Sequence, residues 1–377
     1  MHRLNVAELE AVIGKPLSAV LMKQLDALDE GCRSVLLRSP LAGFGYCDEQ
    51  GIQRSTFVGG RPGFVHVESP KRIVLEVDTD VAPKRGSGGS FVFLLPGVGE
   101  TLRLNGSVEG HRNGRLMVTV EEAFVHCPKC ILRSGLWQPQ RPRGAAPLLP
   151  GNGALIQPAM ADFLASAPFA VLSTWDAAGA SDTSPRGDPP GFIRLLDEHT
   201  LVIPDRKGNR RSDTFHNLMT CDRISLAVIV PGRQEVLHVR GIAWVTDEPS
   251  LLSTLALKEK APQLALCVRV LGAELVPNAA LRAAELWQPS SHVARADVPD
   301  LMSLATQHLA RNRAKGVKAA LLRALARVLG AFPESFRRLI DKALRSDLAK
   351  EGYEAANHGQ LLPSEAHPRR GRNGKNE

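Results

Sequence analysis

The residues best suited to bind a ligand follow a short apolar run in the middle of the chain. Residues 201–203 are Leu, Val and Ile, and the next ten are Pro204-Asp205-Arg206-Lys207-Gly208-Asn209-Arg210-Arg211-Ser212-Asp213. This order predicts a strand, a basic turn and the start of a helix. Free backbone N–H groups at a helix start, with Arg and Lys beside them, favour an anion such as a monophosphate. The alternative is a solvated turn in which Ser212 or Asp213 caps the helix.

A second polar segment lies just upstream. It reads Asp182-Thr183-Ser184-Pro185-Arg186-Gly187-Asp188-Pro189-Pro190-Gly191-Phe192. This segment can hydrogen-bond the edge of a polar heteroaromatic ring through its hydroxyl groups, its arginine and the backbone groups that glycine leaves accessible. We expect this segment to offer such groups where it crosses the face of a barrel.

A third segment contains a lone Cys-x-x-Cys pair, Cys127 and Cys130, beside His126 and Lys129. A structural zinc site needs four ligands, no second pair is present, and His126 is too close in sequence to complete a tetrahedron. No metal site is therefore predicted. We expect His126 and Lys129 to point into a cleft, with the two cysteines packed beneath it. The chain also lacks a nucleophile elbow, a P-loop and a dinucleotide fingerprint, so no catalytic residue is assigned.

The chain carries one sequence pattern twice. Residues 62–67 match residues 190–195 at an offset of 128, and residues 96–106 match residues 231–241 at an offset of 135. The sequence Leu-Trp-Gln-Pro at 136–139 recurs at 286–289. Matches in the same order at slowly drifting offsets are hard to obtain by chance. They indicate that a fold that normally pairs with itself has been fused into one chain.

Each copy has the pattern of short antiparallel strands. Residues 73–77, 90–95, 100–104 and 116–120 are rich in β-branched residues and separated by Gly, Pro and Asn turns, which favours a barrel over βαβ units. The second copy adds predicted helices at 212–220 and 249–258, so the first copy is the trimmed one. We place the N-terminal module at 1–140, a Pro-, Arg- and Gly-rich linker at 141–154 and the C-terminal module at 155–292.

The end of the chain has a different pattern. Apolar residues recur at helical spacing over 297–353, and residues 354–377 are polar and predicted to be disordered. These helices could dock on the double barrel or face a membrane surface. Docking is expected, because apolar stripes at helical spacing usually serve a core.

The composition indicates a globular protein, and we expect it to be cytoplasmic. The chain has 377 residues with 44% hydrophobic content, no run of 18 apolar residues and no signal-peptide pattern. Its six cysteines lack the spacing of a disulfide framework and fit a reducing compartment. The net charge of +8 is concentrated after residue 310, and aromatic residues make up only 5%. Nucleic-acid binding is therefore not expected.

Taken together, the three segments resemble the pyridoxamine 5′-phosphate oxidase-like family of FMN-binding split β-barrels. The match is closest to a bacterial branch with a Ser-Pro-Arg-Gly-Asp-Pro-Pro-Gly-Phe segment, an Ile-Pro-Asp-x-x-Gly-Asn-Arg-Arg-x-Asp segment, and a late motif of His-Cys-x-Lys-Ala followed by Arg-Ser-x-Leu-Trp. The resemblance covers roughly residues 5–290 in two copies. It implies tandem split β-barrels, an α+β and mostly β fold, that form an intrachain pseudo-dimer with C-terminal helices appended.

The same resemblance implies a flavin mononucleotide (FMN) site in the cleft between the barrels. The basic turn would hold the phosphate, Ser184, Arg186 and Gly187 would border the ring or the ribityl chain, and the late motif would face the ring or the substrate space. The implied cofactor-binding residues are Ser184, Arg186, Gly187, Asp205, Lys207, Asn209, Arg210, Arg211, His126, Lys129, Arg133 and Ser134.

The two copies have lost different parts of this pattern. The second keeps the phosphate turn but has Val276-Pro277-Asn278-Ala279-Ala280 in place of the late motif, whereas the first keeps the late motif and has only a short turn at 81–87. One complete site per chain is therefore expected. The resemblance implies a flavin-dependent oxidoreductase acting on an unidentified small molecule, with NADH or NADPH as a candidate electron donor. The alternative is a non-catalytic flavin- or haem-binding protein, or an interaction scaffold.

Overall fold

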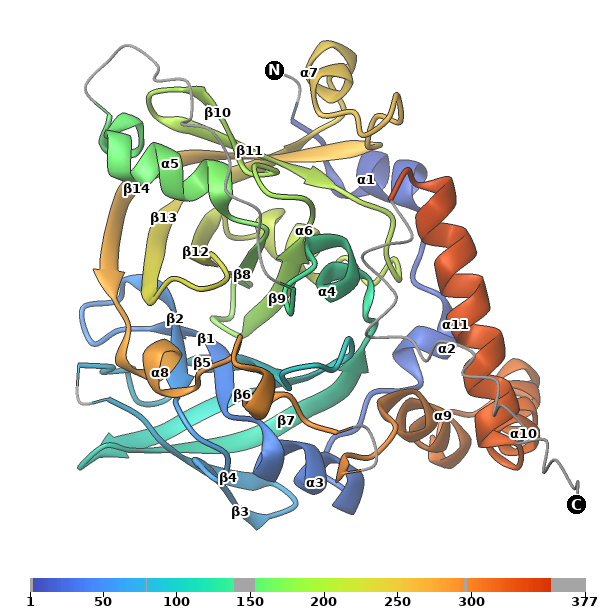
Figure 1. Cartoon of the computed structure of the whole chain (residues 1–377). Helices are drawn as coiled ribbons and strands as arrows, with labels where there is room; N and C mark the ends of the chain where they lie inside the picture. The colour runs from blue at the N-terminus through green and yellow to red at the C-terminus, as the bar shows by residue number, and fades with distance from the viewer. Residues whose placement is uncertain (1–2, 79, 139–152, 295–296, 354–377) are drawn as a thin grey trace, which may run out of the picture.

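The computed structural model describes residues 3–78, 80–138, 153–294 and 297–353, and it contains two seven-stranded antiparallel sheets (Figure 1). The first has the strand order β2-β1-β5-β6-β7-β4-β3, and the second has the order β9-β8-β12-β13-β14-β11-β10. The two orders are the same, strand for strand. The first sheet contains β1 (Leu41–Cys47), β2 (Gln53–Gly59), β3 (Val65–Ser69), β4 (Arg72–Glu76), β5 (Gly88–Leu94), β6 (Thr101–Arg112) and β7 (Arg115–His126).

The second sheet repeats the first in its register as well. It contains β8 (Phe169–Trp175), β9 (Ser181–Gly187), β10 (Arg194–Asp197), β11 (Thr200–Asp205), β12 (Arg223–Ile229), β13 (Glu235–Thr246) and β14 (Leu264–Pro277). Leu41 pairs with Gly59 as Phe169 pairs with Gly187, which reproduces the sequence offset of 128. The chain is therefore a pair of tandem split β-barrels, as the repeat predicts.

The helices of the two modules correspond only in part. α3 (Glu30–Arg38) precedes β1 as α5 (Pro158–Ser166) precedes β8, and α4 (Lys129–Ser134) follows β7 as α8 (Ala279–Ala283) follows β14. The second module also has α6 (Asp213–Leu218) and α7 (Pro249–Thr254), which lie where the sequence predicts its two extra helices. Short helices complete the set: α1 (Val6–Ile13), α2 (Ser18–Leu21), η1 (Ala154–Ile156) and η2 (Pro289–Ser291).

Each barrel encloses its own apolar core. Phe44 and Phe91 stack in the first core with ring centroids 4.5 Å apart. The second core includes Leu4 and Leu9, so α1 packs on the second module although it precedes the first. Although α1 is the first helix of the chain, it therefore lies beside the basic turn of the second module.

The two barrels meet through a close-packed interface that glycine makes possible. A Cβ atom on Gly45 would lie 2.2 Å from Ser173 Oγ, so the strands can approach this closely only without a side chain there. Beside it, buried hydroxyl groups hydrogen-bond across the interface, with 2.8 Å between Ser55 Oγ and Ser173 Oγ and 2.7 Å between Ser90 Oγ and Thr183 Oγ1. Because their polar groups are paired, these side chains can be buried between the modules.

The C-terminal helices dock to different extents. α9 (Leu301–Arg311) inserts Leu301, Leu304 and Ala305 into the first core, and His308, which is fully buried, bonds to Asp29 across 3.1 Å. α11 (Pro333–Lys350) runs along the edge of both barrels (Figure 1). α10 (Val317–Gly330) lies at the periphery with most of its large apolar residues exposed. The expected docking therefore holds for α9 but not for the outer face of α10.

Nearly all of the expected linker at 141–154 and the whole expected tail at 354–377 lie outside the described residues. Among the described helices, none is both long enough and apolar enough to span a membrane.

Candidate functional site

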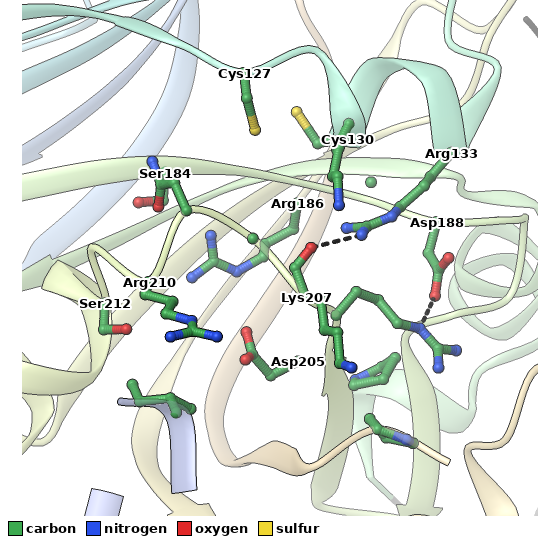
Figure 2. Close-up of a pocket in the computed structure, with 18 of the residues that line it drawn as sticks. Cys127, Cys130, Arg133, Ser184, Arg186, Asp188, Asp205, Lys207, Arg210 and Ser212 are labelled. Atoms are coloured by element: carbon green, nitrogen blue, oxygen red, sulfur yellow. Dashed lines mark hydrogen bonds and ion pairs between the residues drawn. The ribbon is translucent and has the colours of Figure 1, made fainter. Parts of the chain in front are cut away.

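A cavity of about 870 Å³ lies between the two modules (Figure 2). Eleven of the twelve residues expected at a cofactor site line it, and they come from both modules: Ser184, Arg186, Gly187, Asp205, Lys207, Asn209, Arg210, Arg211, His126, Lys129 and Arg133. Ser134 is absent from the lining, because it is buried behind the wall and its hydroxyl donates to the carbonyl of Ile131 at 2.9 Å. The structure therefore brings the three motif segments to one place, although they lie far apart in sequence.

The basic turn follows β11 and adopts an uncommon backbone. Arg210 and Ser212 both have left-handed φ angles, 59° and 58°, which non-glycine residues rarely adopt. Such local strain persists only where the surroundings impose it, and it is frequent at ligand sites. The side chains of Lys207 and Arg210 are exposed at the cavity and make no ion pair with any described residue. The turn therefore presents two cations that are free to meet an anion.

Arg211, by contrast, is already paired. It is 8% exposed, forms ion pairs with Asp213 and with Glu122 on β7, and lies 3.9 Å from the ring centroid of Phe124. Burial lowers the pKa of Arg211, but Asp213 and Glu122 outweigh that effect and the net shift is upward. Arg211 therefore ties the turn of the second module to a strand of the first.

The wall formed by β9 and β11 carries the guanidinium of Arg186 and the carboxyl group of Asp205. Arg186 donates to Thr214 Oγ1 at 2.9 Å and has no carboxylate within ion-pair distance among the described residues. Burial lowers the pKa of Arg186. Burial also raises the pKa of Asp205 to about 6, although the nearby Arg186, Arg133 and Arg206 favour its ionised form. The wall therefore offers a half-buried guanidinium with spare donors beside a carboxyl group whose pKa is raised to about 6.

The opposite wall comes from the end of β7 and from α4. His126 Nδ1 is buried and has no hydrogen-bond partner in the described structure. Burial, together with Arg103, Arg186 and Arg211, holds the pKa of His126 well below its usual range, so the ring is neutral. Cys127 and Cys130 line the cavity, as Figure 2 shows, whereas the sequence predicted that they would pack beneath it.

In the part of the chain that the structure describes, one group of three potential metal ligands lies outside the cavity. Asp29, Cys32 and His308 each present a ligand atom, and these atoms lie within 4.8 Å of one another. However, Asp29 accepts from the backbone N–H of Cys32 as the N-cap of α3 and pairs with His308 through its other oxygen. These contacts attach α9 to α3, and we assign the group a structural role.

The two walls touch where β9 meets α4. A Cβ atom at Gly187 would lie 2.1 Å from the carbonyl oxygen of Cys130. A backbone atom cannot move aside as a flexible side chain could, so any larger residue would push the walls apart. Gly187 thus sets the spacing of the cavity across the module boundary.

The end of α11 covers one side of the cavity. Lys129 Nζ lies 3.0 Å from Asp347 and 2.9 Å from Glu351, and Arg133 also pairs with Glu351. Tyr353 donates to Asp188 and lies under Arg133, with 5.3 Å from the guanidinium carbon to the ring centroid. We call residues 347–353 the C-terminal cover. Two cations of the late motif are therefore held by carboxylates of this cover.

The pseudo-equivalent position in the other half is apolar. Thr101 pairs with His126 as Val236 pairs with Val276, so the strand register places Val276 where the site has His126. By the same alignment Arg186 corresponds to Val58, and Lys129, Cys130, Arg133 and Ser134 correspond to Ala279, Ala280, Ala283 and Ala284. α8 packs against β2 there, and Asn278 bonds to the carbonyl of Phe57 at 3.1 Å. The complementary loss inferred from the sequence is thus a filled interface in the structure.

Several lining residues were not predicted from the sequence. Arg103, on β6, is buried in an ion pair with Asp182. The only feature of the sequence that could have drawn attention to Arg103 is the repeat, in which the equivalent position is His238. Val12 and Ile13 arrive from α1, and residues 260–263 come from the loop before β14. The cover residues Asp347 and Glu351 had no local signal, since their partners lie over 200 residues away.

Comparisons with known proteins relate the second module to one family. The family model described as pyridoxamine 5′-phosphate oxidase matches residues 156–287. Among solved structures, HupZ from Group A Streptococcus is 20% identical, with 31% of this chain and 97% of that chain covered and a TM-score of 0.26. A putative pyridoxamine 5′-phosphate oxidase from Lactobacillus delbrueckii is 16% identical, with 28% and 84% covered and a TM-score of 0.24. HutZ from Vibrio cholerae, described as a haem storage protein, is 14% identical, with 32% and 93% covered and a TM-score of 0.22. No curated protein matches the chain.

Proposed function

We propose that this chain, two split barrels in tandem of which the second matches the pyridoxamine 5′-phosphate oxidase model, binds one FMN between its modules and acts as a flavin-dependent oxidoreductase on a small molecule. The observation that carries this proposal is the convergence of motif residues from both modules on one cavity. Neither module alone supplies both walls.

The residues at the cavity suit FMN in size and charge. A volume of about 870 Å³ falls within the range of ligand pockets, about 300–1,000 Å³. Lys207 and Arg210 are unpaired and would meet the phosphate dianion, whereas Arg186 has donors to spare for the polar edge of the ring. His126 Nδ1 lacks a partner, which a ligand heteroatom would provide. The donor set therefore fits a molecule with an anionic end and a polar heteroaromatic end.

The chain itself would supply binding, orientation and exclusion of water. Flavin, when bound, supplies two-electron transfer. Arg186 would favour negative charge at the ring edge, since its half-buried guanidinium has no carboxylate partner among the described residues. His126 is neutral and would exchange a hydrogen bond, not a charge, with the ligand. The C-terminal cover would exclude water from this side of the cavity.

The absorption spectrum of the purified full-length chain tests the proposal. A flavin spectrum that is bleached by NADH or NADPH and restored by air would support the oxidoreductase. A flavin spectrum that neither nucleotide nor a range of candidate reductants can bleach at a useful rate would leave a flavin-binding protein without this activity. A colourless chain that does not retain added FMN on gel filtration would exclude the proposal.

Haem is the second candidate ligand, and His126 is the observation that favours it. Of the described residues that line the cavity, His126 is the only histidine, and its low pKa keeps the imidazole unprotonated and free to coordinate iron. A Soret band after incubation with haemin, lost in His126→Ala, would favour haem over FMN. A spectrum unchanged by this substitution would argue against iron coordination by His126.

A further inference from the structure

The outer face of α10 is an exposed apolar stripe. Large apolar residues recur along it at intervals of three or four, which places them on one side of a helix. Their exposed fractions are 79% for Val317, 66% for Leu321, 54% for Leu325 and 60% for Val328, and Phe332, two residues past the end of the helix, is 66% exposed. Single exposed apolar residues are ordinary, but a continuous stripe marks an interaction surface.

The stripe does not serve the core of the protein. α10 packs on α9 and α11 through its opposite face, where Ala319 and Ala326 are its buried residues. In Figure 1 the helix lies at the outer edge of the molecule, away from both barrels. In the described structure the apolar side of α10 has no partner.

The segment of the chain that contains the stripe is strongly basic. Residues 311–345 contain ten lysine and arginine residues and only two acidic residues, a formal charge of +8 that equals the net charge of the whole chain. Lys318 and Arg327 border the stripe within α10, and Lys315 precedes it. Most of the ten are exposed: Arg311, Arg313, Lys315, Lys318, Arg327, Arg338, Lys342 and Arg345.

We propose that α10 lies on an anionic lipid surface, with its apolar stripe inserted at the level of the headgroups and the surrounding cations above it. A helix with an apolar face bordered by Lys and Arg is the pattern of interfacial binding, and basic residues near such a surface are attracted to anionic lipids. α10 has 14 residues, too few to cross a bilayer.

Two other partners fit the surface less well. A second copy of the chain would bring two segments of charge +8 together, and their repulsion opposes such a dimer. A nucleic acid would bind the cations but would leave the apolar stripe in water, because phosphate contacts need no apolar face. A lipid surface satisfies both features at once.

Vesicle co-sedimentation of the full chain tests the proposal. We expect it to sediment with vesicles of phosphatidylglycerol and phosphatidylcholine, to stay soluble with phosphatidylcholine alone, and to be released by salt. The variant Leu321→Gln/Leu325→Gln/Phe332→Gln should lose at least tenfold in partitioning, and so should Lys315→Glu/Lys318→Glu/Arg327→Glu. The matched control Leu17→Gln/Leu37→Gln/Leu271→Gln removes three other exposed leucines and should bind as the original chain does.

Other outcomes would overturn the proposal. A chain that ignores all vesicles and forms a dimer that the α10 glutamine variant disrupts would identify a second copy as the partner. Binding to duplex DNA that is lost on charge reversal but kept in the α10 glutamine variant, without vesicle binding, would identify a nucleic acid. Equal vesicle binding by the α10 glutamine variant and the original chain would show that the stripe is not inserted. Since all the substituted side chains are exposed, unchanged thermal unfolding would show that each variant is folded.

Discussion

Arg210 and Arg211 are adjacent in sequence but have different environments. Arg210 is exposed at the cavity without an ion pair in the described structure, whereas Arg211 is buried between Glu122 and Asp213. The resemblance assigns both to the phosphate. The structure separates a cation that is free to bind a ligand from one that joins the modules.

Arg210→Ala should therefore weaken FMN binding about tenfold or more, since a charge-assisted hydrogen bond contributes about 1.5–3 kcal/mol. Riboflavin, which lacks the phosphate, should bind as before. Isothermal titration with both ligands measures the difference. Lys84→Ala/Arg85→Ala, in the short turn of the first module, should change neither affinity. Equal losses for FMN and riboflavin would show that Arg210 does not meet the phosphate.

Asp205 should make the stability of the ligand-free chain depend on pH. Its folded-state pKa is raised from 3.8 to about 6, so the folded state binds more protons than the unfolded state between these values. The free energy of unfolding should then fall as pH rises from about 4 to about 6, by up to about 3 kcal/mol. In Asp205→Asn this contribution should vanish. Denaturant titrations across that range measure it, and an identical pH profile in both proteins would contradict the assigned pKa.

At the scale of elements, the repeat predicts the fold because it lies in strands and turns. Each Gly of the matched turns sits where the backbone needs a left-handed φ, as at Gly63 with 89° and Gly191 with 81°. Local sequence carries such requirements. The two extra helices of the second module could be predicted for the same reason, because their signals are also local in the sequence.

The sequence could not predict which residues would cover the cavity. Glu351 and Tyr353 follow an amphipathic helix and carry no signal of their own, because their partners are chosen by how α11 docks. The exposed face of α10 was missed for a related reason. Its apolar spacing is the same whether the face packs on a core or remains exposed.

Gly187→Ala should disturb the contact between β9 and α4. The added Cβ meets the carbonyl of Cys130, and relieving such a clash costs about 1–3 kcal/mol. We expect a lower melting temperature together with weaker FMN binding, because the two walls of the cavity would separate. Gly330→Ala, in α10, adds the same atom where nothing lies within 4 Å and replaces a helical glycine by a better helix former, so it should lower neither quantity. A Gly187→Ala chain with unaltered FMN affinity would show that this contact does not set the cavity.

The C-terminal cover should control access to the cavity. Glu351→Gln weakens its pairs with Lys129 and Arg133 while keeping the size of the side chain. FMN should then associate and dissociate faster, with a smaller change in equilibrium affinity, because the cover is opened without removing the phosphate contacts. Stopped-flow flavin fluorescence measures both rates. Glu334→Gln, an exposed acid at the start of α11, is the matched control, and equal rates in all three proteins would show that the cover does not limit exchange.

At the scale of the whole molecule, fusion of two barrels allows one interface position to bind a ligand while the other is filled. In a symmetric homodimer every substitution appears at both positions, so a residue cannot serve a ligand on one side and packing on the other. Here Arg186 and His126 stand opposite Val58 and Val276 in the alignment of the two halves. The apolar half contributes to the interface core, and the polar half leaves a cavity.

Titration of the full chain should therefore saturate at one FMN. The filled position lacks the cations and the imidazole of the open one, and alanines of α8 replace the late motif of α4, so a second flavin would have to displace an apolar contact between the modules. Fluorescence quenching at chain concentrations well above the dissociation constant gives the stoichiometry directly. Arg210→Ala should weaken this single binding event without revealing another. Two equivalent tight sites per chain would contradict the asymmetry, because the filled half would then have to open and bind a phosphate without Lys207 and Arg210.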